Sequence, residues 1–235
     1  MPYMSQYTYK TTPYTHQVDA LDMSCEKESF ALFMEMGCGK SKVVIDNFVK
    51  LYMDKKLNGV LIVAPKGVYD NWFTYEIPTH LPDEIPKSIV KWSNANTKKN
   101  KENLETLFDK SDELKIFIMN IEAFSTKRGT EIASKFLMER QCMFIIDEST
   151  TIKNYKAKRT VNTVRLGKYA YYKRILTGSP VTKSPLDLFS QCYFLDPSLL
   201  GFSSYFSFRA RFADLIERSM NGRNFKLVTG YFFFF

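Results

Sequence analysis

Residues 33–46, FMEMGCGKSKVVID, place two glycines, a lysine and a serine where an apolar run gives way to an amphipathic pattern. A glycine-rich turn between a strand and a helix directs several backbone N–H groups toward one point, beside the positive end of the helix dipole. Such a point attracts phosphate. Gly37 and Gly39 permit close approach of the backbone, Lys40 can reach the β- and γ-phosphates of a nucleotide, and Ser41 can ligate Mg²⁺.

The match to a full phosphate-binding loop, GxxxxGK[ST], is incomplete, because Met34 stands where the first glycine is expected. The loop retains Met36, Gly37, Cys38 and Gly39 ahead of the lysine. We expect these residues and the Lys-Ser pair to bind nucleotide. Taken alone, the stretch is also compatible with an ordinary turn between a strand and a helix that carries a surface lysine.

A second group of chemically useful residues ends the apolar stretch MFIIDEST, residues 143–150. Asp147 at the carboxyl end of a buried strand can hold Mg²⁺ through water, and Glu148 can polarise the water that attacks a γ-phosphate. An Asp-Glu pair after a strand is otherwise most often part of a solvated loop. Its pairing with Lys40 and Ser41 changes that reading, because ligands of open α/β sheets bind beyond the carboxyl ends of the strands.

Short apolar stretches alternate with helical patterns along the chain, which is typical of βαβ units and a parallel sheet. Several stretches are continuously apolar, and this favours strands that helices cover on both faces. We therefore predict an α/β domain with a mostly parallel sheet sandwiched by helices. The expected strands are 30–34, 60–64, 89–92, 115–120, 143–146 and 174–177. The expected helices are 16–28, 40–55, 66–76, 100–109, 121–139, 159–169 and 185–194.

Length and composition limit the class of protein. A chain of 235 residues can form one large α/β domain or two small ones. Its four cysteines lie far apart with no C-x-x-C pair, so neither a zinc knuckle nor a disulfide framework is indicated. No apolar stretch reaches the roughly 18 residues of a membrane span, and the first residues do not resemble a secretory signal. We expect a cytoplasmic protein, in the host cytoplasm if a phage encodes it.

The net charge of +8 is concentrated in one segment. No acidic residue occurs between Glu148 and Asp187, where nine basic residues stand, and the rest of the chain nets to −1. The basic residues are compatible with solvated helix faces. The alternative that we favour is a surface for a polyanion.

The end of the chain has a different composition. After Asp196 and Pro197 the sequence becomes aromatic and basic, and YFSFRARF at 205–212 predicts a helix that packs on the end of the sheet. The last residues, GYFFFF at 230–235, suggest either a docked tail or a chain that is cut short, because exposure of four phenylalanines is unfavourable.

Six motifs in order resemble those of one family. They are PYTHQ at 13–17, MEMGCGKS at 34–41, LIVAPKGVYDNW at 61–72, IMNIEAF at 118–124, DESTTIKN at 147–154 and LTGSPVTKSPLDLFSQCYFL at 176–195. They resemble the glutamine motif and motifs I, Ia, Ib, II and III of the first RecA-like lobe of Swi/Snf-type superfamily-two helicases, the phage and bacterial members in particular. The resemblance implies a RecA-like P-loop NTPase lobe over residues 1–196, with a helical and aromatic extension over 197–235 that leads toward a second lobe.

The resemblance also implies a role for each site residue. Gln17 would hydrogen-bond adenine, and the Lys-Ser and Asp-Glu pairs would hold the phosphates, Mg²⁺ and attacking water of ATP. Thr177, Gly178 and Ser179 would couple the nucleotide state to a nucleic-acid groove. On the residues alone, Gln17 could instead cap a helix, and the TGSP sequence could be only a turn.

The family further implies a track for duplex DNA along the loops after the strands, on the opposite side from ATP, where side chains contact backbone phosphates. The candidate residues are Lys66, Asn71, Ser125, Lys127, Lys153, Asn154 and Lys183. Trp72 and Trp92 could stack on bases, although a tryptophan near a strand end is more often part of the core.

The family resemblance predicts an ATP-dependent DNA translocase or helicase core. Motif II reads DEST where the family usually has DEAH or a close variant, so the catalytic carboxylates are present and only the coupling to motif III is in question. The family also needs a second RecA-like lobe whose arginines complete the ATP site. The alternative function is a non-catalytic module that binds nucleotide or DNA, and a P-loop kinase is disfavoured because it gives no reason for the other motifs.

Overall fold

The computed structural model describes residues 7–220 and 223–232. Within them, six parallel strands form one sheet in the order β1-β6-β5-β2-β4-β3. The strands are β1 (Ser29–Phe33), β2 (Gly59–Ala64), β3 (Lys87–Lys91), β4 (Leu114–Asn120), β5 (Cys142–Asp147) and β6 (Tyr172–Thr177). All six predicted strands are therefore confirmed, and so is the parallel α/β class.

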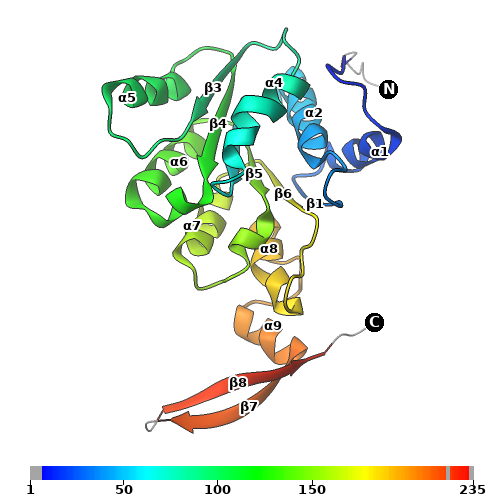
Figure 1. Ribbon diagram of the computed structural model, residues 1–235, viewed down its shortest axis with the longest axis vertical. Helices are drawn as coiled ribbons and strands as arrows, with labels where there is room; N and C mark the ends of the chain where they lie inside the picture. The colour runs from blue at the N-terminus through cyan, green and yellow to red at the C-terminus, as the bar shows by residue number, and fades with distance from the viewer. Residues whose placement is uncertain (1–6, 221–222, 233–235) are drawn as a thin grey trace.

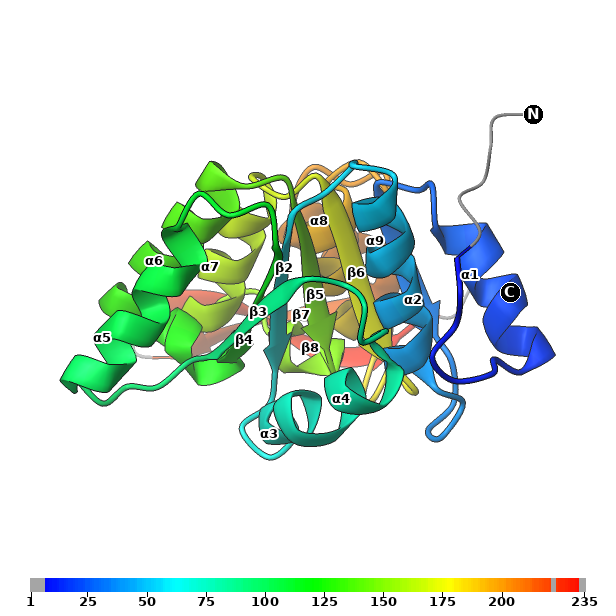
Figure 2. The same cartoon turned by 90° about the horizontal axis from the view of Figure 1, so that it is seen from above.

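Helices cover both faces of this sheet (Figures 1 and 2). The α-helices are α1 (Thr15–Ser24), α2 (Lys40–Met53), α3 (Tyr69–Asn71), α4 (Ile77–His80), α5 (Lys98–Glu105), α6 (Lys127–Glu139), α7 (Lys158–Gly167), α8 (Leu188–Leu195) and α9 (Tyr205–Phe212). The shorter turns are a π-helical turn η1 (Trp72–Glu76) and the 3-10 turns η2 (Thr106–Phe108), η3 (Ile121–Ser125), η4 (Ser149–Ile152) and η5 (Pro185–Asp187). Helices α1, α2 and α4 pack on one face, and α5 to α8 pack on the other.

The core lies on both sides of the sheet because successive side chains of a strand point to opposite faces. In β2, Val60 and Ile62 belong to the cluster under α1 and α2, whereas Leu61 and Val63 belong to the cluster under α5 to α8. Every residue of β2 and of β5 is buried. This two-sided burial explains why the central strands are continuously apolar in sequence.

Parallel pairing brings the functional loops to one edge. Strand β6 pairs with β1 on one side and with β5 on the other. The loop after β1 carries the glycine-rich segment, the loop after β5 begins with Asp147, and the loop after β6 begins with Thr177. Since the carboxyl ends of parallel strands share an edge, the three loops are neighbours.

Several predicted helices differ from the structure. The helix expected over 16–28 ends at Ser24, the one expected over 100–109 divides into α5 and η2, and the one expected over 185–194 begins with η5. The single helix expected over 121–139 is wrong, because η3 and α6 are separated at Thr126. The Asn120 carboxamide accepts from Ala123 N at 2.9 Å and the Thr126 hydroxyl accepts from Gly129 N at 3.1 Å, so each turn has its own cap. The helix expected over 66–76 is replaced by α3, η1 and α4 in succession.

The C-terminal region contains an element that the sequence analysis did not include. The helix expected over 205–212 is confirmed as α9, but it packs on Leu186 and Phe189 of η5 and α8, not on the end of the sheet. After it, β7 (Ala213–Met220) and β8 (Arg223–Tyr231) form an antiparallel hairpin that projects from the lobe in Figure 1. Of the phenylalanine tail, residues 233–235 lie outside the described residues.

Among the described residues, no helix combines the length and the apolarity that a membrane span requires.

Candidate nucleotide and nucleic-acid site

The glycine-rich loop after β1 depends on two left-handed glycines. Gly37 has φ +80° and Gly39 has φ +78°, and Gly39 is the N-cap residue of α2. A Cβ atom at position 39 would lie 2.2 Å from Gln17 Nε2, whereas one at position 37 would meet open space. Position 39 thus requires glycine for its backbone conformation and for its close contact with α1.

The Lys40 side chain hydrogen-bonds to the backbone of this loop. Its ammonium donates to the carbonyl oxygens of Met34 at 3.0 Å and Glu35 at 3.1 Å. These carbonyls offer only partial negative charge, so the phosphate oxygens of a nucleotide would be stronger partners for the same ammonium. The lysine therefore lies in the position from which it can bind a phosphate that enters the loop.

Gln17 connects the first helix to the loop. Its side-chain oxygen accepts from Tyr14 N at 3.0 Å, and its Nε2 donates to the Cys38 carbonyl at 3.1 Å. The ring of His16 also reaches that carbonyl, with Nε2 at 3.0 Å. The capping role that the residues alone allowed is therefore present, and Gln17 lies against the loop at the same time. Contact with adenine remains a prediction.

Asp147 ends the central strand β5 and is 7% exposed. Its Oδ2 accepts from the Trp72 indole at 2.8 Å, and its Oδ1 accepts from Glu148 N at 2.9 Å. Burial raises the pKa of Asp147, and these two hydrogen bonds oppose the rise. The positive charge of Lys40 also lowers the pKa of Asp147, so the loop lysine and the strand carboxylate act on each other across the sheet edge.

Glu148 adopts a strained backbone conformation directly after Asp147. Its φ of +48° and ψ of +61° lie in the left-handed region, which is uncommon for a residue with a Cβ atom. Left-handed residues of this kind cost about 1–2 kcal/mol and concentrate at functional sites. The half-buried Glu148 thus turns the chain sharply from β5 into η4 at the predicted catalytic position.

The loop after β6 packs against the glycine-rich loop. The buried Thr177 accepts from Ser179 N through its hydroxyl oxygen at 3.2 Å. A Cβ atom built on Gly178 would lie 3.5 Å from Met36 N and 3.6 Å from Met34 O, which is van der Waals distance. The residues predicted to couple nucleotide state to nucleic acid are therefore in contact with the loop predicted to bind phosphate.

Glu76 belongs to this site, although the sequence analysis did not include it. Its carboxylate accepts from Asn71 Nδ2 at 3.0 Å and lies near the Ser41 side chain. Burial raises the pKa of Glu76, and the charge of nearby Asp147 raises it further. Its position four residues after Trp72, just beyond the segment that resembles motif Ia, was the available signal.

A buried polar network links the loops after β5 and β6. Ser149 donates to Gln191 Oε1 at 2.6 Å, and Gln191 Nε2 donates to the carbonyl oxygens of Pro180 and Asp187, each at 2.8 Å. The Ser149 and Gln191 side chains are both fully buried. Ser149, where DEST departs from the usual DEAH, thus has a specific partner on α8 that sequence reasoning missed.

The predicted nucleic-acid residues follow β2, β4, β5 and β6, at the same sheet edge. Lys66, Asn71, Ser125, Lys127, Asn154 and Lys183 are exposed. Lys153 differs, because its ammonium contacts the Thr182 hydroxyl and lies 3.3 Å from Asp187 Oδ2. Asp187 also accepts from the backbone N–H groups of Thr182 and Lys183. Burial opposes ionisation of Asp187, but these contacts hold its pKa below the ordinary value.

Of the two roles considered for the tryptophans, the core position is confirmed. Trp72 is 0% and Trp92 is 1% exposed, so neither ring is available to stack on a base. Their indole N–H groups bond to Asp147 and Asn94, respectively.

The basic segment between Glu148 and Asp187 does not form a single surface, because Arg174 is fully buried and bonds to Asn47.

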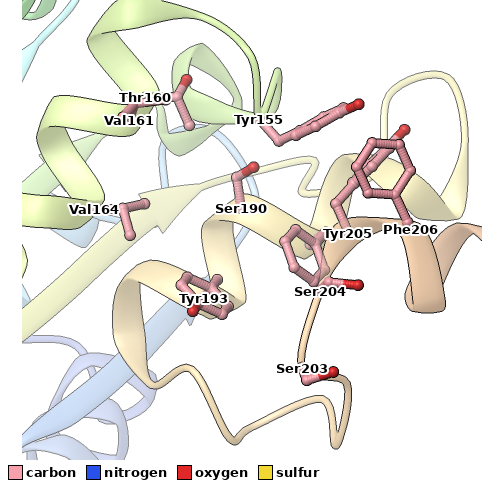
Figure 3. Close-up of a pocket in the computed structure, with 11 residues that line it drawn as sticks. Tyr155, Thr160, Val161, Val164, Ser190, Tyr193, Ser203, Ser204, Tyr205 and Phe206 are labelled. Atoms are coloured by element: carbon pink, nitrogen blue, oxygen red, sulfur yellow. The ribbon is translucent and has the colours of Figure 1, made fainter.

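A separate cavity of about 310 Å³ lies between α7, α8 and α9. Figure 3 shows Tyr155, Tyr193 and Phe206 among the side chains around it, and the Tyr155 ring stacks on that of Tyr205 with centroids 3.6 Å apart. Of the described residues that line it, none comes from the glycine-rich loop or from the Asp-Glu pair. The cavity is therefore distinct from the candidate nucleotide site.

Comparison with curated proteins gives relatives that are much longer than this chain. Helicase SWR1 of Cryptococcus neoformans is 26% identical over 197 residues, which cover 79% of this chain and 15% of that protein. The chromatin-remodeling ATPase INO80 of Saccharomyces cerevisiae is 27% identical over 191 residues, which cover 78% of this chain and 12% of that protein.

Comparison with solved structures supports the same fold. The SWI2/SNF2 ATPase core of Sulfolobus solfataricus, solved in complex with double-stranded DNA, matches with a TM-score of 0.68 and 22% identity. The match covers 90% of this chain and 41% of that one. The SNF2-related domain family matches residues 16–227, and the chain therefore belongs to this family, as the six ordered motifs predicted.

Proposed function

We propose that this chain is the first, ATP-binding lobe of a DNA-dependent ATPase that translocates on duplex DNA. One observation carries the proposal: β6 lies between β1 and β5, so that the glycine-rich loop, Asp147 and Thr177 meet at one sheet edge. In this proposal Lys40 and Ser41 hold the phosphates and Mg²⁺, and Asp147 positions the metal.

The proposed reaction is hydrolysis of the γ-phosphate of ATP. Phosphoryl transfer requires neutralisation of the phosphate charge and a water molecule in line with the bond that breaks. The Lys40 ammonium supplies positive charge, a bound Mg²⁺ would add to it, and Glu148 would orient and activate the water. The donors present, which are a serine hydroxyl and carboxylates, are the oxygen ligands that Mg²⁺ prefers.

The proposed second ligand is the backbone of duplex DNA. Six exposed side chains at the carboxyl ends of β2, β4, β5 and β6 are suited to phosphate contacts, because they are cationic or carry neutral hydrogen-bond donors. The Sulfolobus protein that shares this fold was solved with double-stranded DNA. We propose that the same class of ligand binds here.

A second lobe is part of the proposal. This chain covers 41% of the Sulfolobus ATPase core and smaller shares of the curated relatives. We propose that arginines of a second RecA-like lobe complete the ATP site. Since an arginine finger is worth about 10³–10⁵ in rate, residues 1–235 alone are expected to turn ATP over slowly.

The test is phosphate release by this chain together with the proposed second lobe, with and without duplex DNA. We expect DNA to stimulate release, Lys40→Ala to weaken nucleotide binding, and Glu148→Gln to keep binding but lose about 10²–10⁴ in rate. Glu139→Gln, on the exposed end of α6, is the matched control. Binding of nucleotide and DNA without any stimulated release would contradict the proposal and favour a non-catalytic binding module.

A further inference from the structure

The π-helical turn η1 reaches two different parts of the candidate metal site. Trp72 and Glu76 stand at its two ends, and the backbone N–H of Ile77 donates to the Trp72 carbonyl across it. Trp72 donates to Asp147, at the end of β5, and Glu76 lies near Ser41, in the first turn of α2. Single π-helical turns of this kind are rare and occur frequently at functional sites.

Ser41 needs a partner for its proton if its oxygen is to bind a metal. A hydroxyl has one donor and two acceptor positions, so a cation on the oxygen is compatible with donation to a neighbouring carboxylate. Glu76 is that neighbour. Carboxylates that accept from a metal ligand fix its orientation and increase its affinity for the metal.

Trp72 orients the Asp147 carboxylate as Glu76 orients the Ser41 hydroxyl. An indole N–H can only donate, so its 2.8 Å bond to Oδ2 holds the carboxylate in one rotamer while other lone pairs of both oxygens stay available. The ring is 0% exposed, and the packing around it prevents the indole from turning away.

Glu76 is itself held in place. Asn71 Nδ2 donates to its Oε1 at 3.0 Å, and His80 Nε2 lies 3.8 Å from its Oε2. Its side chain is only 18% exposed. A residue that merely solvates the surface would not be enclosed by an amide, an imidazole and the Ser41 side chain together.

We propose that η1 is a positioning element for the magnesium site, in which Glu76 orients Ser41 and Trp72 orients Asp147. This inference rests on the proposed function, because it assumes that Ser41 and Asp147 bind Mg²⁺. Neither Trp72 nor Glu76 needs to touch the metal.

The test is the binding of N-methylanthraniloyl-ADP to the 235-residue chain, followed by fluorescence anisotropy with and without Mg²⁺. We expect Glu76→Ala to reduce the Mg²⁺-dependent gain in affinity by about tenfold or more, with little change in the metal-free affinity. Glu76→Gln should restore most of the gain, because an amide oxygen still accepts from Ser41. Glu139→Ala is the matched control and should bind as the unmodified chain does.

The outcomes separate the inference from the proposed function. A full Mg²⁺-dependent gain in Glu76→Ala overturns the inference but leaves the function intact, and failure of Glu76→Gln to restore the gain would mean that the carboxylate itself binds the metal. Absence of any Mg²⁺-dependent gain in the unmodified chain would instead contradict the proposed function. If Glu76→Ala does not fold, Trp72→Phe tests the inference independently. The inference requires that Trp72→Phe also lose the Mg²⁺-dependent gain in nucleotide affinity.

Discussion

The indole nitrogen of Trp72 lies 2.8 Å from Oδ2 of Asp147, although the two residues are 75 positions apart in the chain. The bond connects the segment after β2 to the carboxylate at the end of β5. It also explains how the fold tolerates an aspartate that is only 7% exposed, because each carboxylate oxygen has a donor. A buried carboxylate without such donors is costly.

Trp72→Phe should destabilise the fold in a pH-dependent way. The phenyl ring keeps most of the packing but removes the N–H, which we expect to cost about 1–3 kcal/mol when Asp147 is ionised. Burial raises the pKa of Asp147 in the fold, and loss of the donor raises it further. A raised carboxyl pKa contributes stability that is fully present below the ordinary carboxyl pKa and is lost as pH rises through the folded-state value. The difference from the unmodified chain should therefore be larger at pH 8 than at pH 3.5.

Urea denaturation at the two pH values measures this difference. Trp92→Phe is the matched control, because it removes an indole N–H that bonds to the neutral Asn94 side chain. Its cost should not depend on pH. An equal cost of Trp72→Phe at both pH values would show that the Asp147 carboxylate does not depend on the indole.

The Ser149 and Gln191 side chains should behave as one unit. Ser149→Ala leaves the buried Gln191 oxygen without its donor, which we expect to cost about 1–3 kcal/mol. Gln191→Leu removes the acceptor of the Ser149 hydroxyl and one donor from each of the Pro180 and Asp187 carbonyls, with a cost in the same range. Because the two side chains share one hydrogen bond, the double variant should lose less stability than the sum of the single variants.

A double-mutant cycle in urea gives the coupling energy, which we expect to be about 0.5–3 kcal/mol. Ser134→Ala on α6, where the hydroxyl contacts only Met138 Sδ at 3.6 Å, serves as the reference serine. Simple additivity of the two substitutions would mean that the network does not act as a unit.

Arg174 should be essential for stability and not for binding a polyanion. Its guanidinium donates to Asn47 Oδ1 at 2.9 Å and to the Ser24 carbonyl at 2.8 Å, and it is 0% exposed. Burial lowers its pKa to about 10. Arg174→Met should cost about 3 kcal/mol, because it leaves buried acceptors unpaired between α1, α2 and β6.

Arg165→Met on the exposed side of α7 is the comparison, and it should change stability by no more than about 0.5 kcal/mol. Thermal and urea unfolding of both variants measure the difference. Similar stabilities of the two variants would contradict the structural role of Arg174.

The salt dependence of DNA binding should distinguish two of the candidate lysines. Each phosphate contact contributes about 0.9 to the slope of log K against log salt for duplex DNA. Lys66 is exposed, so Lys66→Ala should lower the slope by about that amount. Lys153 is engaged by Asp187 and Thr182, so Lys153→Ala should change the slope less.

The measurement is duplex DNA binding at several salt concentrations. Lys98→Ala on α5 is the control, because that lysine is 91% exposed and lies outside the predicted track. A slope that is insensitive to Lys66→Ala would remove this residue from the DNA contacts.

The sequence was sufficient to predict the strands of the sheet and the functional residues that follow them. Strands such as β2 and β5 are continuously apolar because both faces are buried, and this leaves a direct signal in the sequence. The roles of Lys40 and Asp147 follow from residue type and from position at a strand end. The identity of a side chain's partner leaves no comparable signal in the sequence. The proximity of Glu76 to Ser41 and the hydrogen bond from Ser149 to Gln191 depend on which distant loops the topology brings together.

The hairpin of β7 and β8 differs from these partner contacts, because the sequence did contain a signal for it. Asn221-Gly222 stands between the two strands in the sequence, and this dipeptide favours tight hairpins. The helix predicted over 205–212 is confirmed, but no strand was predicted for the residues that follow Phe212.

The position of β1 at the edge of the sheet constrains when the candidate site can form during synthesis. In the described sheet β1 pairs only with β6, and Ser29 lies opposite Lys173. A ribosome that adds about 5–20 residues per second therefore releases β1 several seconds or more before its partner strand exists. Until then the glycine-rich segment of the nascent chain has no neighbouring strand to hold its carboxyl end, and nucleotide binding should appear only in nascent chains that already include β6.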